Sequence, residues 1–224
     1  NDPVPWIAWQ EISNNPDAKN QIFVSRAIKQ ATSPAPCPVG TKPTGGNDVG
    51  GFCWQQVGIE RAVSGTVTIT DPSLNVDVHR DGIEPDIAFT GPNDTVPWVV
   101  WYEENVGTGG LATNKLVFAA KGVADATADG GFKWVVEGNG TAGLGGQVLD
   151  TSGTHGMGPC GVSITAERAC SLNKIGTADA ENPRVAAGTL TPGTPTVPWV
   201  VWEEDIGGGT HAIFVSRLVG GDHF

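Results

Sequence analysis

The sequence predicts an all-β fold made of propeller-type, four-stranded antiparallel blades. Three observations predict it. A tryptophan-rich segment occurs three times, similar apolar runs follow the copies in the same order, and connections rich in glycine and asparagine separate the runs. A self-similar period of roughly 90–100 residues determines the architecture before any single motif does. Four short strands per repeat is the strand count of a propeller blade.

The clearest repeated strand reads Val-Pro-Trp, followed by a second tryptophan and a glutamate. Its copies begin at Val4, Val96 and Val197. The next strand in each unit is mostly apolar and ends on a cation, at residues 22–26, 117–121 and 213–217. The connections between the two strands, such as 13–17, 107–110 and 207–209, are of the kind that hairpins require. We therefore expect these two strands to pair antiparallel.

Two further runs complete the unit. A strand at 84–88, repeated at 182–186, precedes the tryptophan strand, and a Gly-Phe-x-Trp strand at 51–54 is repeated at 131–134. The blade units span approximately 1–57, 84–137 and 181–224, with inserts at 58–83 and 138–180, and we expect them to form the single domain 1–224. One run, 164–172, has helical periodicity.

The first and the third unit are incomplete. The first lacks the strand that precedes its tryptophan motif, and the third stops where its last strand would begin. Propellers need about four to eight blades, so three incomplete blades do not close a ring. Either the sequence is a segment of a longer protein or copies of the chain assemble, and we expect self-association as a homodimer that would close a six-bladed propeller.

The paired tryptophans indicate sheets that are buried on both faces. Side chains alternate along a strand, so the two tryptophans of each motif point to opposite faces. The six residues are Trp6, Trp9, Trp98, Trp101, Trp199 and Trp202. A packed core between neighbouring blades is the main interpretation. An aromatic platform that stacks on sugars is the alternative.

The charge restricts the partners. The formal net charge is −11, which repels phosphate backbones and anionic lipid, so we expect no nucleic acid and no membrane partner. Acidity suits cations and neutral or cationic ligands. No stretch approaches the roughly 20 apolar residues that span a bilayer.

The cysteines indicate an oxidising compartment. The chain has four, and none of them forms a Cys-x-x-Cys pair, so a zinc site is the weaker interpretation. We predict two disulfides, Cys37–Cys53 and Cys160–Cys170, and an extracellular location.

One polar segment breaks the repeat. Asp77 and His79 stand where the following unit has uncharged residues, and Asp81 comes two residues later, before a glycine. Three ligands at alternate positions resemble the start of a calcium loop, and the histidine would also accept zinc. Glu84 and Asp86 lie close enough in the sequence to complete the ligand shell. The sequence therefore predicts a divalent metal site, and an ordinary polar turn is the alternative.

His155 lies in a glycine-rich part of the insert that corresponds to the one holding His79. Inserts at one blade position gather at one end of a propeller, so His155 is the candidate for an added ligand or a catalytic base.

Opposite charges also recur in register. The glutamates are Glu11, Glu103 and Glu204, and the cations of the adjacent strand are Arg26, Lys121 and Arg217. We expect them to form one cross-strand ion pair per blade, rather than a catalytic group.

The arrangement of the 84–88, 96–101 and 213–217 motifs resembles the blades of sialidase-like and propeller-lectin proteins, and that of secreted actinobacterial repeat proteins. The resemblance implies a propeller architecture. The sialidase Asp box, Ser-x-Asp-x-Gly-x-x-Trp, is absent, which argues against glycan hydrolysis.

Two functions remain open. One is a metal-assisted hydrolase of esters, lactones or phosphotriesters, similar to six-bladed propeller lactonases, in which the cation polarises the substrate and activates water. The other is an extracellular carbohydrate-binding, lectin-like module that binds a glycan or another small molecule without catalysis.

Overall fold

A computed structural model describes residues 4–12, 18–29, 52–59, 72–107, 110–138, 147–148, 160, 163–219 and 224. Sheet 1 consists of β1 (Trp6–Ile12), β2 (Asn20–Lys29) and β3 (Phe52–Gln56), in that order. Sheet 2 consists of β4 (Asp81–Thr90), β5 (Val96–Glu104), β6 (Leu116–Ala124), β7 (Phe132–Val136) and the two-residue β8 (Gln147–Val148). Sheet 3 consists of β9 (Ala180–Gly188), β10 (Val197–Asp205) and β11 (His211–Arg217). Two short helices accompany them, η1 (Pro92–Asp94) and α1 (Ile164–Cys170).

The prediction of a β fold is confirmed as a set of three antiparallel sheets. The predicted strand order is also found, since β4, β5, β6 and β7 are hydrogen-bonded neighbours in chain order. Sheets 1 and 3 each contain the predicted three strands. Among the described residues the sheets are open and do not close into a ring. The run with helical periodicity forms α1, which begins after Ser163, whose Oγ accepts a hydrogen bond from the N–H of Ala166 (3.1 Å).

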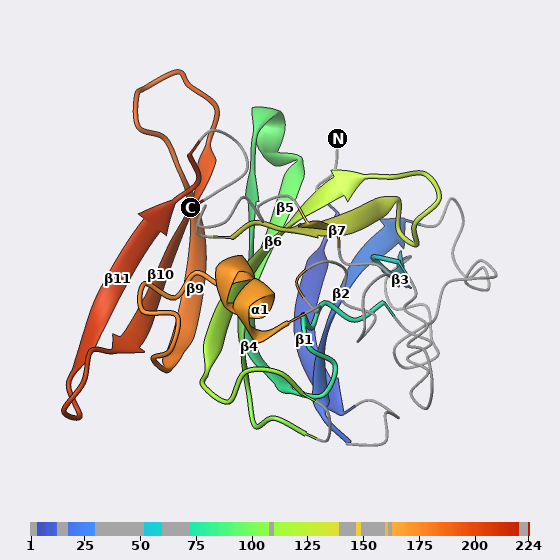
Figure 1. Cartoon of the computed structure of the whole chain (residues 1–224). Coiled ribbons are helices and arrows are strands. Elements are labelled where there is room, and N and C mark those ends of the chain that lie inside the picture. The colour runs from blue at the N-terminus through green and yellow to red at the C-terminus, as the bar shows by residue number, and fades with distance from the viewer. Residues whose placement is uncertain are drawn as a thin grey trace.

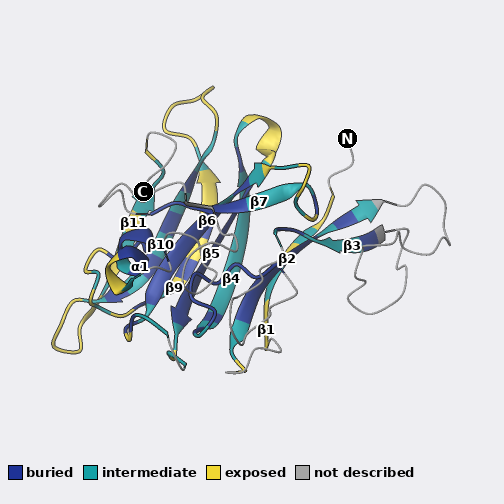
Figure 2. Ribbon diagram, turned by 45° about the vertical axis from the view of Figure 1, so that its right-hand side comes forward, coloured by how far each residue is buried: buried dark blue, intermediate teal, exposed yellow. Residues whose placement is uncertain are grey.

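Sheet 2 lies between the other two sheets (Figure 1). One apolar cluster fills the space between sheets 1 and 2, and a second fills the space between sheets 2 and 3. Buried residues gather where the sheets face each other, whereas exposed residues lie mainly in the connections (Figure 2). Trp101 belongs to the first cluster, and Trp98 and Trp202 belong to the second. The interpretation as core between sheets is confirmed for these three tryptophans, and Trp6 is half-buried against the first cluster. Trp9 and Trp199 are half-buried and belong to neither cluster.

A β-bulge interrupts the first strand of sheet 2 and the first strand of sheet 3. The register shifts between Ile83 and Asp86 in β4, and the same shift occurs where β9 pairs with β10. Glu84 and Asn182 occupy equivalent places in these bulges and have positive φ angles of 52° and 56°. Bulges redirect side chains, and at this one the half-buried candidate ligand Glu84 contacts Arg184 of sheet 3.

A disulfide joins Cys160 to Cys170, the last residue of α1, as predicted. Cys53 is also disulfide-bonded, while its predicted partner, Cys37, lies outside the described residues. No helix in the described part of the chain is long and apolar enough to cross a bilayer.

Replacing both Cys160 and Cys170 by alanine should lower the free energy of unfolding by about 3 kcal/mol. The disulfide joins residues 10 apart in the sequence and so restricts the conformations open to the unfolded chain. Urea unfolding of the wild type and the double variant measures the difference. Equal midpoints and slopes in the two proteins would contradict this role.

Candidate functional site

The predicted ligand Asp77 is fully buried and already bonded to the backbone. Its Oδ1 accepts a hydrogen bond from the N–H of His79 (2.9 Å), and its Oδ2 accepts one from the N–H of Leu111 (2.9 Å). The carboxylate therefore holds a turn of its own segment and fixes that turn to the connection between β5 and β6. This is the polar-turn alternative of the sequence analysis.

The other predicted ligands point to different partners. Asp81 accepts a hydrogen bond from the N–H of Asn20 (2.8 Å) and pairs with Lys19 (3.3 Å), and these two residues lie where β2 of sheet 1 begins. Glu84 lies 3.6 Å from Arg184 of sheet 3. Among the described residues, Asp77, His79, Asp81 and Glu84 do not form a group of ligand atoms within 4.8 Å of one another. Metal binding by this set stays a prediction, and His155 lies outside the described residues.

Arg80, next to the predicted ligands, forms a fully buried charge network. One guanidinium nitrogen pairs with Glu167 of α1 (3.0 Å), and the other donates to the backbone oxygens of Glu103 and Asn114. The second carboxylate oxygen of Glu167 accepts a hydrogen bond from the N–H of Ala112 (2.8 Å). Burial raises the pKa of Glu167, and the charge of Arg80 opposes this rise.

Glu103 is a second buried carboxyl group in this network. It accepts hydrogen bonds from the N–H groups of Val76 and Asp77 and from Nε1 of Trp101 (2.9 Å). Burial nevertheless raises the pKa of Glu103 to about 8, against the effect of Arg80 and of these donors. Glu103 thus connects β5 to the segment that enters sheet 2.

Glu204 repeats this arrangement in sheet 3. It accepts hydrogen bonds from the N–H groups of Lys174 (2.9 Å) and Ile175 and from Nε1 of Trp202 (2.9 Å). The glutamate that recurs in the tryptophan strand is therefore an acceptor for the segment that joins one sheet to the next. Its role is structural in sheets 2 and 3.

The predicted cross-strand ion pairs are wrong. Glu103 lies opposite Leu116, whereas Lys121 lies opposite Trp98, at the other end of the strand pair. Lys121 instead pairs with Glu137 (2.7 Å), just beyond β7. The corresponding pairs in the other sheets are equally far apart, since Glu11 faces Gln21, Arg26 faces Trp6, Glu204 faces Ala212 and Arg217 faces Trp199. The glutamates and cations recur at the same spacing in every unit, so the sequence suggested that they face each other. Because the two strands run antiparallel, the glutamate lies at one end of each strand pair and the cation at the other.

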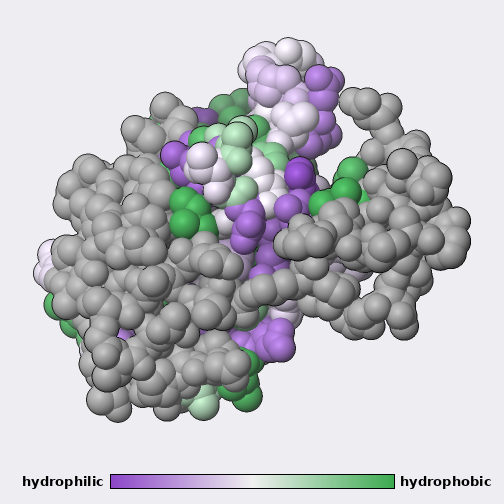
Figure 3. All heavy atoms as spheres, turned by 90° about the vertical axis from the view of Figure 1, so that its right-hand side faces the viewer, coloured by the Kyte–Doolittle hydropathy of each residue, from purple (hydrophilic) through white to green (hydrophobic). Residues whose placement is uncertain are grey.

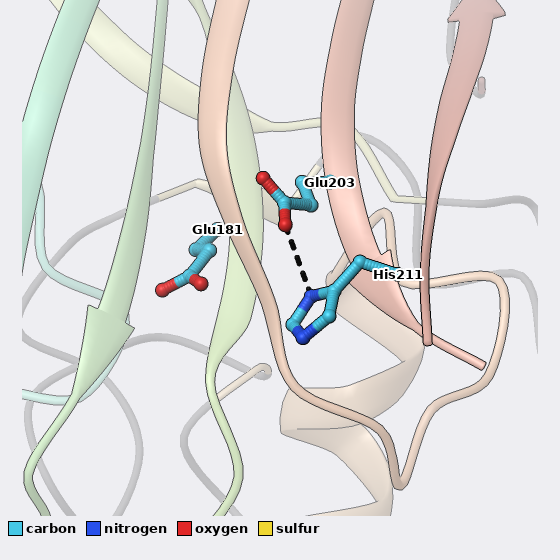
Figure 4. A group of neighbouring side chains, drawn as sticks. All are labelled: Glu181, Glu203 and His211. Atoms are coloured by element: carbon cyan, nitrogen blue, oxygen red, sulfur yellow. Dashed lines mark ion pairs between the residues drawn. The ribbon is translucent and has the colours of Figure 1, made fainter. Parts of the chain in front are cut away.

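Within the described ranges, one group of possible metal ligands is present, and it lies on sheet 3 (Figure 4). Glu181, Glu203 and His211 have ligand atoms within 4.8 Å of one another, and Nδ1 of His211 lies 3.0 Å from Glu203. Glu181, however, already forms an ion pair with Lys115 of sheet 2. Exposed groups of acidic residues are common without an ion, and here the contacts with Lys115 and between His211 and Glu203 already engage both glutamates.

A groove between sheets 1 and 2 is lined by aromatic rings. Trp6 of β1 meets Phe89 of β4 and Phe132 of β7 edge to face, with ring centres 5.5 Å apart in both pairs. The groove has a volume of about 420 Å³, and Arg26, Asp94 and Thr95 add polar groups to its wall. Aromatic walls with a few polar groups are typical of small-molecule sites.

Arg26 differs from its counterpart in sheet 2. Lys121 is neutralised by Glu137, but Val57 occupies the position equivalent to Glu137 in the first unit. Within the described residues, the buried Nε of Arg26 has no hydrogen-bond partner, and the guanidinium lies 5.9 Å from the centre of the Phe132 ring. Burial lowers the pKa of Arg26, yet a guanidinium stays charged at neutral pH. Within the described residues Arg26 forms no ion pair, and the groove lining brings the carboxylate of Asp94 together with this guanidinium.

A second cavity, of about 330 Å³, lies beside β11. Its lining includes Trp202, Phe214 and Phe224 together with Asn173 and Lys174. Unlike the groove, it borders the segment that Glu204 fixes in place.

Sequence reasoning missed Arg26, Phe89 and Phe132 as candidate site residues. The sequence held a signal for Arg26. In the alignment of the first two units, Val57 stands at the position of Glu137, so Arg26 lacks the carboxylate that pairs with Lys121. The aromatic contacts had no such signal, since they join different sheets.

Comparisons with protein-family models, with curated proteins and with solved structures find no match to this chain.

The free energy of unfolding should fall as the pH rises from about 4.5 to about 8. Glu103 has a pKa of about 8 in the folded protein and an ordinary value of 4.5. In this window the folded state holds the proton more tightly than the unfolded chain, so each step upward in pH favours unfolding. The raised pKa of Glu167 acts in the same direction. Urea unfolding in a series of buffers across the window measures the slope.

Glu103→Gln is the control, because glutamine removes the titration while keeping the size of the side chain. We expect a flatter pH profile in this variant. The same slope in both proteins would mean that Glu103 does not titrate in this window.

Proposed function

We propose that this protein is a carbohydrate-binding module on a propeller-type scaffold, and that the groove between sheets 1 and 2 is its ligand site. The observation that carries the proposal is the combination, in one groove, of three aromatic rings with a guanidinium whose buried Nε has no hydrogen-bond partner within the described residues. A pyranose ring has an apolar face that stacks on aromatic side chains and a rim of hydroxyl groups that hydrogen-bond. Aromatic side chains with polar neighbours suit such an amphipathic ligand.

The propeller part of the proposal is supported by the sheet topology. Sheet 2 is a meander of four main strands in chain order, as in a blade, and sheets 1 and 3 lie against its two faces. The segments that enter sheets 2 and 3 are held in the same way. Glu103 binds the backbone of the segment before sheet 2, and Glu204 binds that of the segment before sheet 3. Repetition of both the sheets and the junctions is what a propeller requires.

Arg26 gives the site a preference for an acidic sugar. A partly buried guanidinium without an ion-pair partner binds a carboxylate through charge-assisted, two-point hydrogen bonds. Asp94 and Thr95 also line the groove, where the carboxylate can accept hydrogen bonds from sugar hydroxyl groups and the threonine hydroxyl can donate or accept them. The ligand class is therefore a sugar that carries a carboxylate, such as a uronic or sialic acid.

Secretion is part of the same proposal. The Cys160–Cys170 disulfide supports an oxidising compartment. Glycans that carry carboxylates are abundant outside cells, so the location agrees with the ligand.

A metal-assisted hydrolase is the competing proposal. It would use Asp77, His79, Asp81 and Glu84 with a calcium or zinc ion, and His155 as the base. Its support is weaker, because both oxygens of Asp77 accept backbone hydrogen bonds and Asp81 is engaged by sheet 1.

Two variants test the groove by calorimetric titration with glucuronic acid and with glucose. Trp6→Ala should weaken binding of both sugars by about 10-fold, because it removes the stacking surface. Arg26→Gln should weaken binding of glucuronic acid by about 10- to 100-fold and leave glucose unchanged, because it removes only the charge-assisted bonds.

Arg184→Gln is the matched control, since Arg184 is exposed and lies outside the groove. Equal losses in Arg184→Gln and Arg26→Gln would contradict the site. If a panel of neutral and acidic glycans gives no binding to the wild type, the proposed function fails.

Chelator treatment separates the two proposals. A binding module should keep its sugar affinity after dialysis against EDTA, and His79→Ala should keep it as well, because His79 lies outside the groove lining. Metal content and hydrolysis of ester, lactone and phosphotriester substrates are measured on the same samples. Bound metal and hydrolysis that fall together in His79→Ala would instead favour the hydrolase.

A further inference from the structure

The outer face of sheet 3 exposes apolar positions that are buried in the other two sheets. Ile213 and Val215 of β11 are 67% and 61% exposed. Their equivalents, Val117 and Ala119 in sheet 2 and Ile22 and Val24 in sheet 1, are all 0% exposed. These equivalents are buried because the next sheet packs on them. The outer face of sheet 3 therefore has the apolar side chains that, in the other two sheets, contact a neighbouring sheet.

The outer face of sheet 1 shows the opposite half of the same interface. Ile7 is 45% exposed and Glu11 is exposed, whereas their equivalents Val99, Val200, Glu103 and Glu204 are 0% exposed. In sheets 2 and 3 these positions face the preceding sheet and its connecting segment. On the side of the molecule that carries sheet 1, the described residues show separate hydrophobic patches among hydrophilic ones (Figure 3).

We propose that the outer face of sheet 3 packs on the outer face of sheet 1 of a second copy of this chain. The contact would repeat the interface that sheet 1 makes with sheet 2, and sheet 2 with sheet 3. The chain thus carries both halves of an interface that it already uses twice. A second copy of the chain can therefore bind through the outer faces of sheets 1 and 3 alone.

Two copies complete the arrangement. A contact between two different faces is heterologous, and it produces either a closed ring or an open filament, depending on the rotation between neighbours. Two chains with three sheets each give six blades, which is within the range of closed propellers. The inference rests on the propeller-type packing proposed above, but not on the ligand, so a failure to bind sugar would leave it intact.

Uncovered, the face of sheet 3 would be a liability. Exposed β-branched residues on β11, an edge strand of its sheet, favour uncontrolled pairing with other chains. Specific packing against a second copy removes that exposure.

Light scattering after gel filtration tests the proposal on the full chain. The wild type should have twice the mass of one chain. The double variant Ile213→Glu and Val215→Glu should be a monomer at concentrations where the wild type is a dimer, because it places charges in an apolar interface, and its dissociation constant should rise by about 100-fold or more.

Leu190→Glu is the matched control. Leu190 is 57% exposed, but it lies in the connection between β9 and β10, so this variant should remain a dimer. Circular dichroism verifies that each variant folds. Ile7→Glu is a second interface variant, which places a charge on the outer face of sheet 1.

Mixing the two interface variants gives the sharpest test. The copy with glutamates at positions 213 and 215 keeps an intact sheet 1 face, and the Ile7→Glu copy keeps an intact sheet 3 face. Together they should form a one-to-one complex through a single intact junction, although each alone is a monomer.

Three results would overturn the proposal. They are a wild type that stays a monomer at high micromolar concentration, a dimer that survives both interface variants, and folded variants that do not combine when mixed. Sugar binding by a monomeric wild type would retain the proposed function while rejecting the dimer.

Discussion

The structure depends on the side-chain hydrogen bonds to backbone N–H groups where the chain crosses from one sheet to the next. Before sheet 2, Asn75 accepts the N–H of Ile22 in sheet 1, and Glu103 of sheet 2 accepts the N–H groups of Val76 and Asp77. The segment before sheet 3 makes the same contacts with its own asparagine and glutamate. A buried N–H group without a partner costs free energy comparable to a lost hydrogen bond. These amide and carboxylate side chains therefore determine where each sheet lies against its neighbour.

The chemistry of the candidate site comes from a departure from this repetition. In sheet 2 the cation at the end of the second strand, Lys121, pairs with Glu137. In sheet 1 the corresponding cation is Arg26, and the sequence position equivalent to Glu137 holds Val57. The loss of one carboxylate leaves the fold intact, because the apolar contacts between sheets are unaffected. It leaves the guanidinium of Arg26 in the wall of the groove beside Trp6, with its buried Nε unpartnered within the described residues.

Much of the fold could be predicted from the sequence, because strand order and buried faces follow from local patterns. The alternating tryptophans indicated sheets covered on both sides, and the aligned units gave the order of β4 to β7. The site could not be predicted in the same way. Asp77 resembled a metal ligand because its backbone partner, Leu111, is remote in the sequence. The groove escaped prediction because Trp6 and Phe132 belong to different sheets.

The buried pair of Arg80 and Glu167 limits how the repeat can be rearranged in evolution. Arg80 belongs to the segment that enters sheet 2, whereas Glu167 belongs to the segment that enters sheet 3. Duplicating or exchanging one unit would separate the two charges and leave one of them buried alone, which is strongly destabilising. The units therefore resemble one another without being interchangeable. A viable recombinant must move both inserts together or replace both residues with apolar ones.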